Sequence, residues 1–545
     1  MDATVTIDNI TDLEQLRTVA KKSSVDIQIA NDRIRELENK LLLKEERIAE
    51  LMRERWGRSS ERLTGGEKST QGDLFDEIET VARQEKSESD SVPVKNHIRK
   101  RGKRARLPES LPRIETIVDI DETEKVCPCG TALVKIGEDT SEKLEVIPAR
   151  FVVRRTVRPR YACPCCGGTE NEPEPPVSVA QNPPSILPKT NATPSLLATI
   201  ATWKFQDALP LHRQERIFAR HGICLGRATM SRWMMDVADR CKPIIQELEN
   251  HIRSGPLIGM DETPTQVLGE TDRANTSSSY MWLARGGSPG KMAIRFFYHP
   301  TRAASVPKHF LSGYSGVLQT DGFESYDAAL RSLAAEGNDT IVHAGCMTHA
   351  RRMFIKADRS GKVPTSAKIA LRYFKTLYAI EREASETNLD DEQRTILRKE
   401  KSLPVLIEFR LWLESRRSEV PPESLIGKAI SYTLGQWPKL IRYVDYGYVP
   451  IDNNLVENAV RPFVIGRKNF MFSGSPDGAF ASAMLYSIIE TAKINGHEPF
   501  FYLYYLFSLL PYAKDPASVS ALLPFNVAKK TVYDYAATHW LALDS

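Results

Sequence analysis

The stretch LIGMDETP, residues 257–264, places Asp261 directly after a short apolar run. The stretch VLQTDGF, residues 317–323, places Asp321 after a second apolar run in the same way. Both patterns are typical of a buried β-strand that ends at its aspartate. Because a carboxylate is costly to bury without a cation, the two aspartates are candidates for a site that holds positive charge.

The residues around these aspartates predict a mixed α/β segment. Strands are expected at residues 257–260, 280–284, 292–298 and 316–320, with a helix at residues 303–311 before the last strand. Three successive strands, a helix and a further strand form the element order of an RNase H-like fold. In that fold the first and fourth strands are parallel neighbours with a right-handed crossover, which would set Asp261 beside Asp321.

A third acidic stretch, DNNLVEN at residues 452–458, lies much later in the chain. Asp452 or Asn453 can cap a short helix that carries Glu457 and ends before Pro462. The 135 residues between Asp321 and Glu457 exceed what the fold needs. They contain helix-period apolar residues, the last group of which stops at Gly435, so a mostly helical insertion is predicted.

Two strand-end aspartates and one helical glutamate are the ligands that a two-metal phosphoryl-transfer site needs. Mg²⁺ binds a few anionic oxygens and leaves its other positions to water and substrate phosphate. The alternative is that each carboxylate is a solvated surface charge, as most of the 70 acidic residues are expected to be. Periodicity and burial alone leave both interpretations open.

The composition indicates a globular protein with several domains. A chain of 545 residues with 41% hydrophobic and 26% charged residues has ample material for real cores. The net charge of +4 says little about partners, but seven of the twelve residues at 95–106 are basic. That run is either a solvated tail or a source of sequence-independent phosphate contacts.

The chain also lacks the marks of secretion and of membrane insertion. Its polar, acidic start is unlike a signal peptide, and the aromatic stretch at residues 500–510 is too short to span a bilayer, so a core helix is expected there. Eight cysteines in so long a chain do not make a disulfide scaffold, and a reducing compartment fits.

A heptad pattern begins at Leu13 and is strongest from Ile27 onward. Apolar residues at a and d positions with flanking charges predict a coiled coil and therefore self-association. Lys44 at a d position is a defect in the pattern. A single amphipathic helix lying on another domain is the alternative.

Two cysteine knuckles, CPCG at residues 127–130 and CPCCG at residues 163–167, are separated by alternating segments. This arrangement predicts a zinc ribbon in which four thiolates enclose a closed Zn²⁺ site. The expected ligands are Cys127, Cys129, Cys163 and Cys166, with Cys165 as the substitute. Reduced, unliganded cysteines remain the alternative.

Residues 210–240 contain two helical patterns around the break at residues 222–226. A helix-turn-helix is expected, with Arg227, Thr229, Ser231 and Arg232 facing DNA and Trp233 packing inward. A helix hairpin that binds nothing is the alternative.

Basic residues close to the acidic stretches are further candidate DNA contacts. Arg461, Arg467 and Lys468 follow Glu457 and are placed to bind phosphates, although they could be ordinary surface cations. Cys346 and His349 are too few for a second metal site, so a packing or DNA-positioning role is favoured for His349. Arg351 and Arg352 follow it and are counted as DNA contacts.

Taken in order, these motifs resemble those of DDE transposases of the insertion-sequence sixty-six family, over nearly the full chain. The matching stretches are WGRSSE at 56–61, the two cysteine knuckles, GMDETP, LQTDGF, CMTHARR at 346–352, DNNLVENAVRP, GRKNF at 466–470 and SIIETAKING at 487–496. The resemblance implies that Asp261, Asp321 and Glu457 are metal ligands. The chain departs from the family pattern at Asn458, where the family usually has Arg, and in its first cysteine knuckle, which is one residue short.

These observations together predict a multidomain α/β protein whose RNase H-like catalytic core carries a helical insertion. The expected domains are a coiled coil at 1–55, a disordered basic linker at 56–107, a zinc module at 108–180, the helix-turn-helix region at 185–250, the core at 251–345 and 446–480, the insertion at 346–445 and a helical C-terminal region at 481–545. The expected function is Mg²⁺-dependent (or Mn²⁺-dependent) DNA cleavage and strand transfer by a transposase.

The expected partners are double-stranded DNA at the element ends and the target, further copies of the chain, and helper proteins encoded by the same element. The expected location is the bacterial cytoplasm at the nucleoid, without a membrane. The alternatives are a non-catalytic zinc and helix-turn-helix regulator, which needs no Glu457, and a metal-dependent nuclease without strand transfer.

Overall fold

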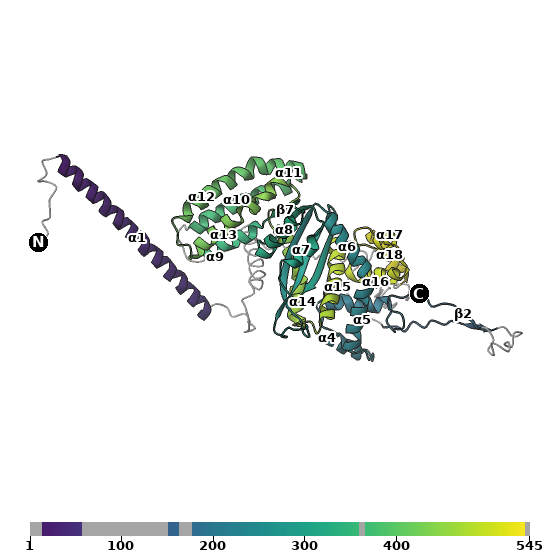
Figure 1. Ribbon diagram of the computed structural model, residues 1–545. Helices are drawn as coiled ribbons and strands as arrows, with labels where there is room; N and C mark the ends of the chain where they lie inside the picture. The colour runs from purple at the N-terminus through teal and green to yellow at the C-terminus, as the bar shows by residue number, and fades with distance from the viewer. Residues whose placement is uncertain (1–12, 57–150, 163–176, 359–365, 540–545) are drawn as a thin grey trace, which may run out of the picture. The chain divides into compact units, whose positions relative to one another are not determined.

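A computed structural model describes residues 13–56, 151–162, 177–358 and 366–539 (Figure 1). The chain divides into two compact units, residues 1–68 with 182–545 and residues 69–181. The predicted zinc ligands Cys127, Cys129, Cys163 and Cys166, the substitute Cys165 and the basic run at 95–106 lie outside the described residues. In the second unit, β1 (Arg160–Ala162) pairs antiparallel with β2 (Val177–Val179).

Helix α1 (Leu13–Trp56) runs for 44 residues without glycine or proline, as the heptad pattern predicts. Exposed charges support it, because the Glu36 carboxylate pairs with Arg33 and Lys40 one turn away on either side. The heptad residues Ile27, Ile34, Leu37, Leu41 and Ile48 are each more than half exposed. The helix therefore carries an uncovered apolar seam in this single chain.

Five strands form the sheet of the first unit, in the order β5-β4-β3-β6-β7. The strands are β3 (Leu257–Gln266), β4 (Ser278–Ser288), β5 (Lys291–His299), β6 (Gly316–Gln319) and β7 (Ile341–Ala344). Strands β3, β4 and β5 are antiparallel neighbours, whereas β6 lies parallel to β3 and β7 lies parallel to β6. The predicted strands, the helix before β6 (α7, Ser305–Leu311) and the parallel pairing of the first and fourth strands are confirmed, while β7 and α8 (Glu324–Ala335) were not predicted.

The prediction that β3 ends at Asp261 is wrong. Parallel pairing with β6 stops at Gly259, but antiparallel pairing with β4 continues to Gln266, so Asp261 lies within the strand opposite Leu283. Asp321 does follow the end of β6, as expected. The end of the apolar run therefore indicates where β3 stops pairing with β6, and not where β3 itself ends.

Helices cover this sheet, and one of them provides hydrogen-bond partners for backbone groups of the edge strand β5. Hydroxyl groups of α15 (Pro476–Ile494) reach the backbone of β5: Ser487 Oγ accepts from Phe296 N at 2.8 Å and Thr491 Oγ1 from Ile294 N at 3.0 Å. Side chains thus pair backbone groups that an edge strand would leave open. The aromatic stretch after α15 forms α16 (Pro499–Leu509), a mostly buried helix, as expected.

The region before the sheet is helical. It contains α3 (Pro194–Ala201), the π-helical turn η3 (Thr202–Gln206), α4 (Leu211–Arg220), α5 (Arg227–Arg240) and α6 (Lys242–Ser254). Helices α4 and α5 are the two expected halves of the helix-turn-helix. In the described part of the chain, no helix combines the length and apolar character that crossing a membrane requires.

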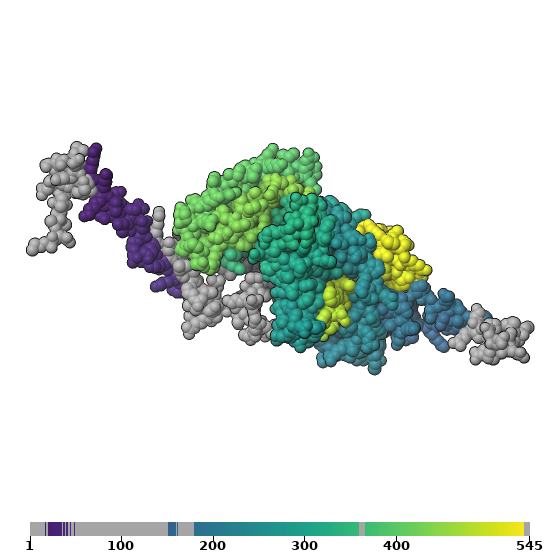
Figure 2. Space-filling model, in the orientation of Figure 1, coloured from purple at the N-terminus to yellow at the C-terminus, as the bar shows by residue number. Residues whose placement is uncertain are grey.

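The insertion between Asp321 and Glu457 is mostly helical, as expected. In Figure 2 its atoms, coloured green, form a lobe beside the teal atoms of the residues that precede it. Its helices are α9 (Met347–Asp358), α10 (Ser366–Glu386), α11 (Asp391–Leu397), η4 (Arg398–Ser402), α12 (Leu403–Arg417), α13 (Leu425–Leu440) and η5 (Ile441–Asp445). Phe354, Phe374, Phe409 and Trp437 form its aromatic core, which joins buried residues of β6 and β7.

Two predicted helix ends are wrong. Helix α13 continues past Gly435 because the side chains of Trp437 and Leu440, later in the same helix, are buried in the core. Helix α14 (Asn454–Phe470) continues through Pro462, since Phe463 and Val464 are buried just after it. At both places the free energy gained by burying apolar side chains outweighs the free-energy cost of glycine or proline within a helix.

Candidate active site

The two predicted aspartates lie together at the middle of the sheet. Oxygen atoms of Asp261, Glu262 and Asp321 all lie within 4.8 Å of one another. Burial raises the pKa of Asp261 well above its usual value, and the charges of Glu262, Asp321 and Glu457 raise it further. A cation bound among these carboxylates would relieve both the desolvation and the repulsion.

The third acidic stretch is tied to the same two strands. Gln319 Nε2 donates to Pro450 O at 2.7 Å, and Asn453 Nδ2 donates to Met260 O at 3.1 Å. At Gly259 a Cβ atom would stand 2.4 Å from Val456 Cγ2, so β3 and the start of α14 approach as closely as glycine allows. These contacts bring α14, which carries Glu457, against the strand of Asp261.

Glu457 is 2% exposed and faces helix α9 of the insertion. Arg352 Nη2 donates to its Oε2 at 2.7 Å, and the Nδ1 atom of His349 lies 3.6 Å from its Oε1. Among the described residues, neither Glu457 Oε1 nor His349 Nδ1 has a hydrogen-bond partner, although both atoms are buried. Arg352 Nη1 donates to His349 Nε2 at 3.3 Å, so the proton of a neutral imidazole lies on Nδ1 and faces Glu457 Oε1.

The groups around Glu457 differ in how well they suit metal binding. Burial lowers the pKa of His349, which favours the neutral imidazole, and the lone pair of that ring accepts from Arg352. Burial raises the pKa of the Cys346 thiol, whose Sγ atom accepts a hydrogen bond from Asn453 N at 3.2 Å. The Cys346 sulfur, a ring nitrogen of His349 and an oxygen of Glu457 all lie within 4.8 Å of one another, as a group separate from the cluster of Asp261, Glu262 and Asp321.

Glu262 is a residue of the site that the sequence reasoning missed. It is buried, and its two oxygens are held by Arg302 Nε at 2.7 Å and by the hydroxyl of Tyr326 at 2.5 Å. The Arg302 guanidinium also lies 3.4 Å from the ring centroid of Phe323. Its only sequence signal was the Asp-Glu pair, and its partners lie on distant segments.

Residues of the helical insertion hold the turn that carries Asp321. Tyr432 OH donates to Asp321 O at 2.8 Å, and Phe323 N donates to Asp321 Oδ1 at 2.9 Å. Gly322 has φ of 91°, and a Cβ atom there would meet Gln436 at 2.8 Å. The helical insertion thus positions both Asp321 and Glu457.

The predicted DNA-contacting residues fall into two groups, those whose side chains reach the surface and those bonded inside the protein. On α5, Arg227 and Arg232 are exposed, Thr229 and Ser231 are half-buried, and Trp233 packs inward as expected. Lys468 is exposed and Arg461 is half-buried.

Three other predicted DNA contacts have partners inside the protein. Arg467 Nη1 donates to Thr263 Oγ1 at 3.0 Å, Arg351 lies 5.7 Å from the ring of Tyr378, and Arg352 binds Glu457. These contacts indicate that some of the predicted DNA-binding arginines instead hold residues of the candidate site in place.

Four family models match parts of this chain. Residues 189–481 match the family described as "Transposase IS66 family", and residues 124–167 match the "zinc-finger binding domain of transposase IS66". Residues 44–116 match "Transposase C of IS166 homeodomain", and residues 487–525 match the "IS66 C-terminal element".

Two similar proteins come from Sinorhizobium fredii (strain NBRC 101917 / NGR234). The uncharacterized protein y4jD is 34% identical over 402 residues, which cover 73% of this chain and 76% of that protein. The uncharacterized protein y4qI is 32% identical over 519 residues, which cover 93% of this chain and 92% of that protein. With a family match across more than half of its length, this chain belongs to the IS66 family of transposases.

Proposed function

We propose that the protein cleaves DNA at the ends of its mobile element and joins those ends to target DNA, using Asp261, Asp321 and Glu457. One observation carries the proposal. Oxygen atoms of Asp261 and Asp321 lie within 4.8 Å of each other, and Asn453, four residues before Glu457, donates to the backbone of the strand that carries Asp261. The strand order β5-β4-β3-β6-β7 supports an RNase H-like core around them.

The proposed cofactor is a pair of divalent cations, Mg²⁺ or Mn²⁺, held by these three carboxylates. When bound, such ions lower the pKa of a water or a DNA hydroxyl and stabilise charge on the leaving oxygen. Arg352 orients Glu457 from one side, and the neutral His349 faces its other oxygen. Arg302 and Tyr326 hold Glu262, so that Asp261 and Asp321 carry the open oxygen atoms of the cluster.

Other parts of the chain would bind DNA and zinc. The zinc-finger match supports a Zn²⁺ site at Cys127, Cys129, Cys163 and Cys166. Arg227 and Arg232 on the exposed side of α5, and Lys468 at the end of α14, are proposed DNA contacts, with Thr229, Ser231 and Arg461 beside them. Because the proposed substrate is chromosomal DNA, the proposed place of action is the bacterial nucleoid.

The decisive test incubates the purified full-length chain with Mg²⁺ and DNA that carries the element ends. We expect nicks that leave 3′-hydroxyl groups, followed by joined products when a target plasmid is added. Binding without cleavage would identify a non-catalytic regulator. Cleavage without joined products would identify a nuclease.

We also propose that α1 pairs with α1 of further copies through its apolar seam. Leu37→Asp should lower the mass measured by light scattering, because a carboxylate at a d position would have to be buried in the coiled coil. Ile29→Asp is the matched control, since Ile29 is also more than half exposed but lies at neither an a nor a d position. An unchanged mass for Leu37→Asp, or the same loss for both variants, would contradict pairing through this seam.

A further inference from the structure

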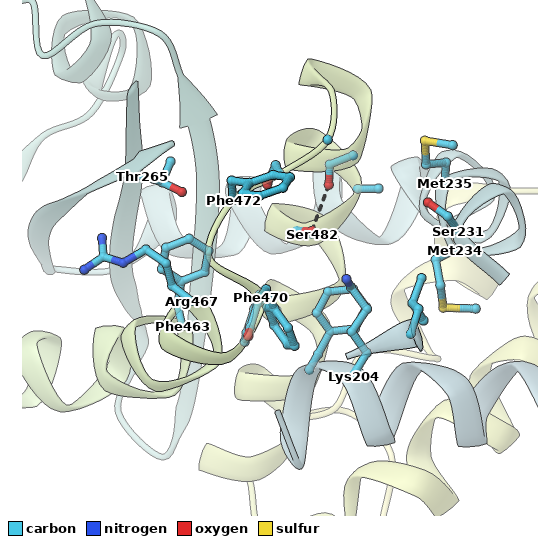
Figure 3. A pocket seen from close by; sticks show the side chains of 17 residues that line it. Lys204, Ser231, Met234, Met235, Thr265, Phe463, Arg467, Phe470, Phe472 and Ser482 are labelled. Carbon is cyan, nitrogen blue, oxygen red and sulfur yellow. Dashed lines mark hydrogen bonds between the residues drawn. The ribbon is translucent and has the colours of Figure 1, made fainter. Parts of the chain in front are cut away.

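A cavity of about 110 Å³ lies where η3, α5, the end of β3, α14 and α15 meet (Figure 3). Its charged lining consists of two cations, Lys204 and Arg467, without a carboxylate. The lining also includes Ser231, Ser482, the apolar Met234 and Met235, and several aromatic rings. Positive charge, hydrogen-bond donors and rings in one cavity fit a ligand that carries both an anion and an aromatic ring.

Lys204 is the central polar group of this cavity. It sits on the π-helical turn η3, a type of turn that is frequent at functional sites. Its Nζ atom lies 4.6 Å from the ring centroid of Phe470 and 5.5 Å from that of Phe205, and Figure 3 shows it pointing into the cavity. Within the described chain no carboxylate contacts it, and burial alone lowers its pKa to about 8. An anion in the cavity would offset the cost of burying this ammonium group.

The N-terminus of helix α15 opens onto the same space. Gly474 and Gly478 line the cavity, and the N-cap Ser475 accepts a hydrogen bond from Gly478 N at 3.1 Å. The dipole of this 19-residue helix adds to the attraction for an anion, but Pro476 has no N–H and Gly478 N is already bonded, so the helix contributes its field and not direct hydrogen bonds. Asp477, in the first turn, is exposed and does not line the cavity.

An aromatic residue is presented at the cavity by a strained turn. Met471 has φ of 68°, a conformation that is costly for a residue with a side chain. The turn is anchored to the end of β3, because Ser473 N donates to Gln266 O and Leu268 N donates to Ser473 O, both at 2.9 Å. Phe472 follows Met471, lines the cavity and is still 47% exposed. An exposed ring beside the half-buried cations Lys204 and Arg467 is a platform on which an unpaired base can stack.

The cavity lies on the elements that carry the proposed active site. Thr265, which lines it, is four residues after Asp261 on β3 and on the same face, a separation of about 13 Å. Arg467 is on the helix of Glu457 and bonds Thr263, which lies between those two strand positions. DNA engaged at the carboxylates would therefore reach the cavity within about four base steps.

We propose, on the basis of the proposed function, that this cavity holds an unpaired nucleotide of the bound DNA close to the cleaved bond. The phosphate of that nucleotide lies at Lys204 and the N-terminus of α15, and its base stacks on Phe472. A base inside a duplex is inaccessible to such a cavity, so the nucleotide must come from a frayed or single-stranded end.

The test measures binding without divalent metal, so that no cleavage occurs. The probes are a blunt duplex carrying the element end and the same duplex with a short unpaired end that contains 2-aminopurine. We expect Phe472→Ala and Lys204→Met each to weaken binding of the unpaired-end DNA about tenfold and to leave blunt-duplex binding unchanged. The control is Lys399→Met, which removes an exposed lysine from another π-helical turn, η4, and should change the binding of neither DNA.

The outcomes separate this inference from the proposed function. Loss of the 2-aminopurine fluorescence change in Phe472→Ala supports the inference, and Phe472 is exposed enough for that variant to fold even where Lys204→Met does not. Unchanged binding of the unpaired end by Phe472→Ala overturns it. Competition by free deoxyadenosine monophosphate as strong as that by the unpaired DNA also overturns it, in favour of a free nucleotide as the ligand. Failure of the wild-type chain to bind either DNA would overturn the proposed function itself.

Discussion

Asp321→Asn is expected to abolish DNA strand cleavage and leave binding of the element ends largely intact. The substitution keeps the shape of the side chain and its hydrogen bond from Phe323 N, but it removes the negative charge that a divalent cation would need. We expect the cleavage rate to fall by about 10³-fold or more, which corresponds to about 4 kcal/mol of lost transition-state stabilisation. Cleavage is followed with end-labelled DNA in Mg²⁺, and binding by fluorescence anisotropy without metal.

Glu324→Gln is the matched control for this experiment. Glu324 lies three residues after Asp321, in the first turn of α8, and its side chain is exposed. Removing its charge alters the local charge by the same amount without touching the carboxylate cluster. Cleavage at the wild-type rate by Asp321→Asn, or an equal loss in both variants, would refute the metal-binding role of Asp321.

Arg352→Met is expected to destabilise the protein strongly. The substitution leaves Glu457, 2% exposed, without the guanidinium that now donates to it at 2.7 Å. Removing one partner of a buried ion pair typically costs about 3–5 kcal/mol, because the other charge remains buried. The free energy of unfolding is measured by urea denaturation of the metal-free chain.

Two further variants test whether the destabilisation comes from the loss of the bond between Arg352 and Glu457. Adding Glu457→Gln to Arg352→Met should recover about 1–3 kcal/mol, because the stranded charge is gone. Arg351→Met, next along α9, removes an arginine that lies over Tyr378 and should cost about 1 kcal/mol or less. Equal destabilisation by Arg351→Met and Arg352→Met would show that Arg352 has no special link to Glu457.

Local sequence patterns predicted the elements of the site more accurately than their ends. The apolar runs at residues 257–260 and 316–320 predicted two strands, and the structure places them side by side and parallel. Strand β3 nevertheless extends to Gln266 because β4 continues to pair with it. Helix α14 likewise crosses Pro462, because burial of the residues after it compensates for the lost hydrogen bond.

The surroundings of the candidate ligands could not be read from the sequence. Glu262 looked equivalent to any acidic neighbour of Asp261, yet it is engaged by Arg302 and Tyr326, 40 and 64 residues away. Arg352 was expected to contact DNA, but it meets Glu457 across 105 residues of chain. Such pairings depend on how the insertion packs on the sheet, for which periodicity carries no signal.

By itself, the sequence determined the properties that depend on near neighbours along the chain. These are the long helix α1 with its apolar seam, the paired helices α4 and α5, and the apolar strands that precede the two aspartates. Only the tertiary structure decided which charges meet, which of them remain open, and that Lys204 and Phe472 share a cavity. The physical reason is that the energy of a buried charge is set by the atoms that replace water around it, and those atoms come from distant segments.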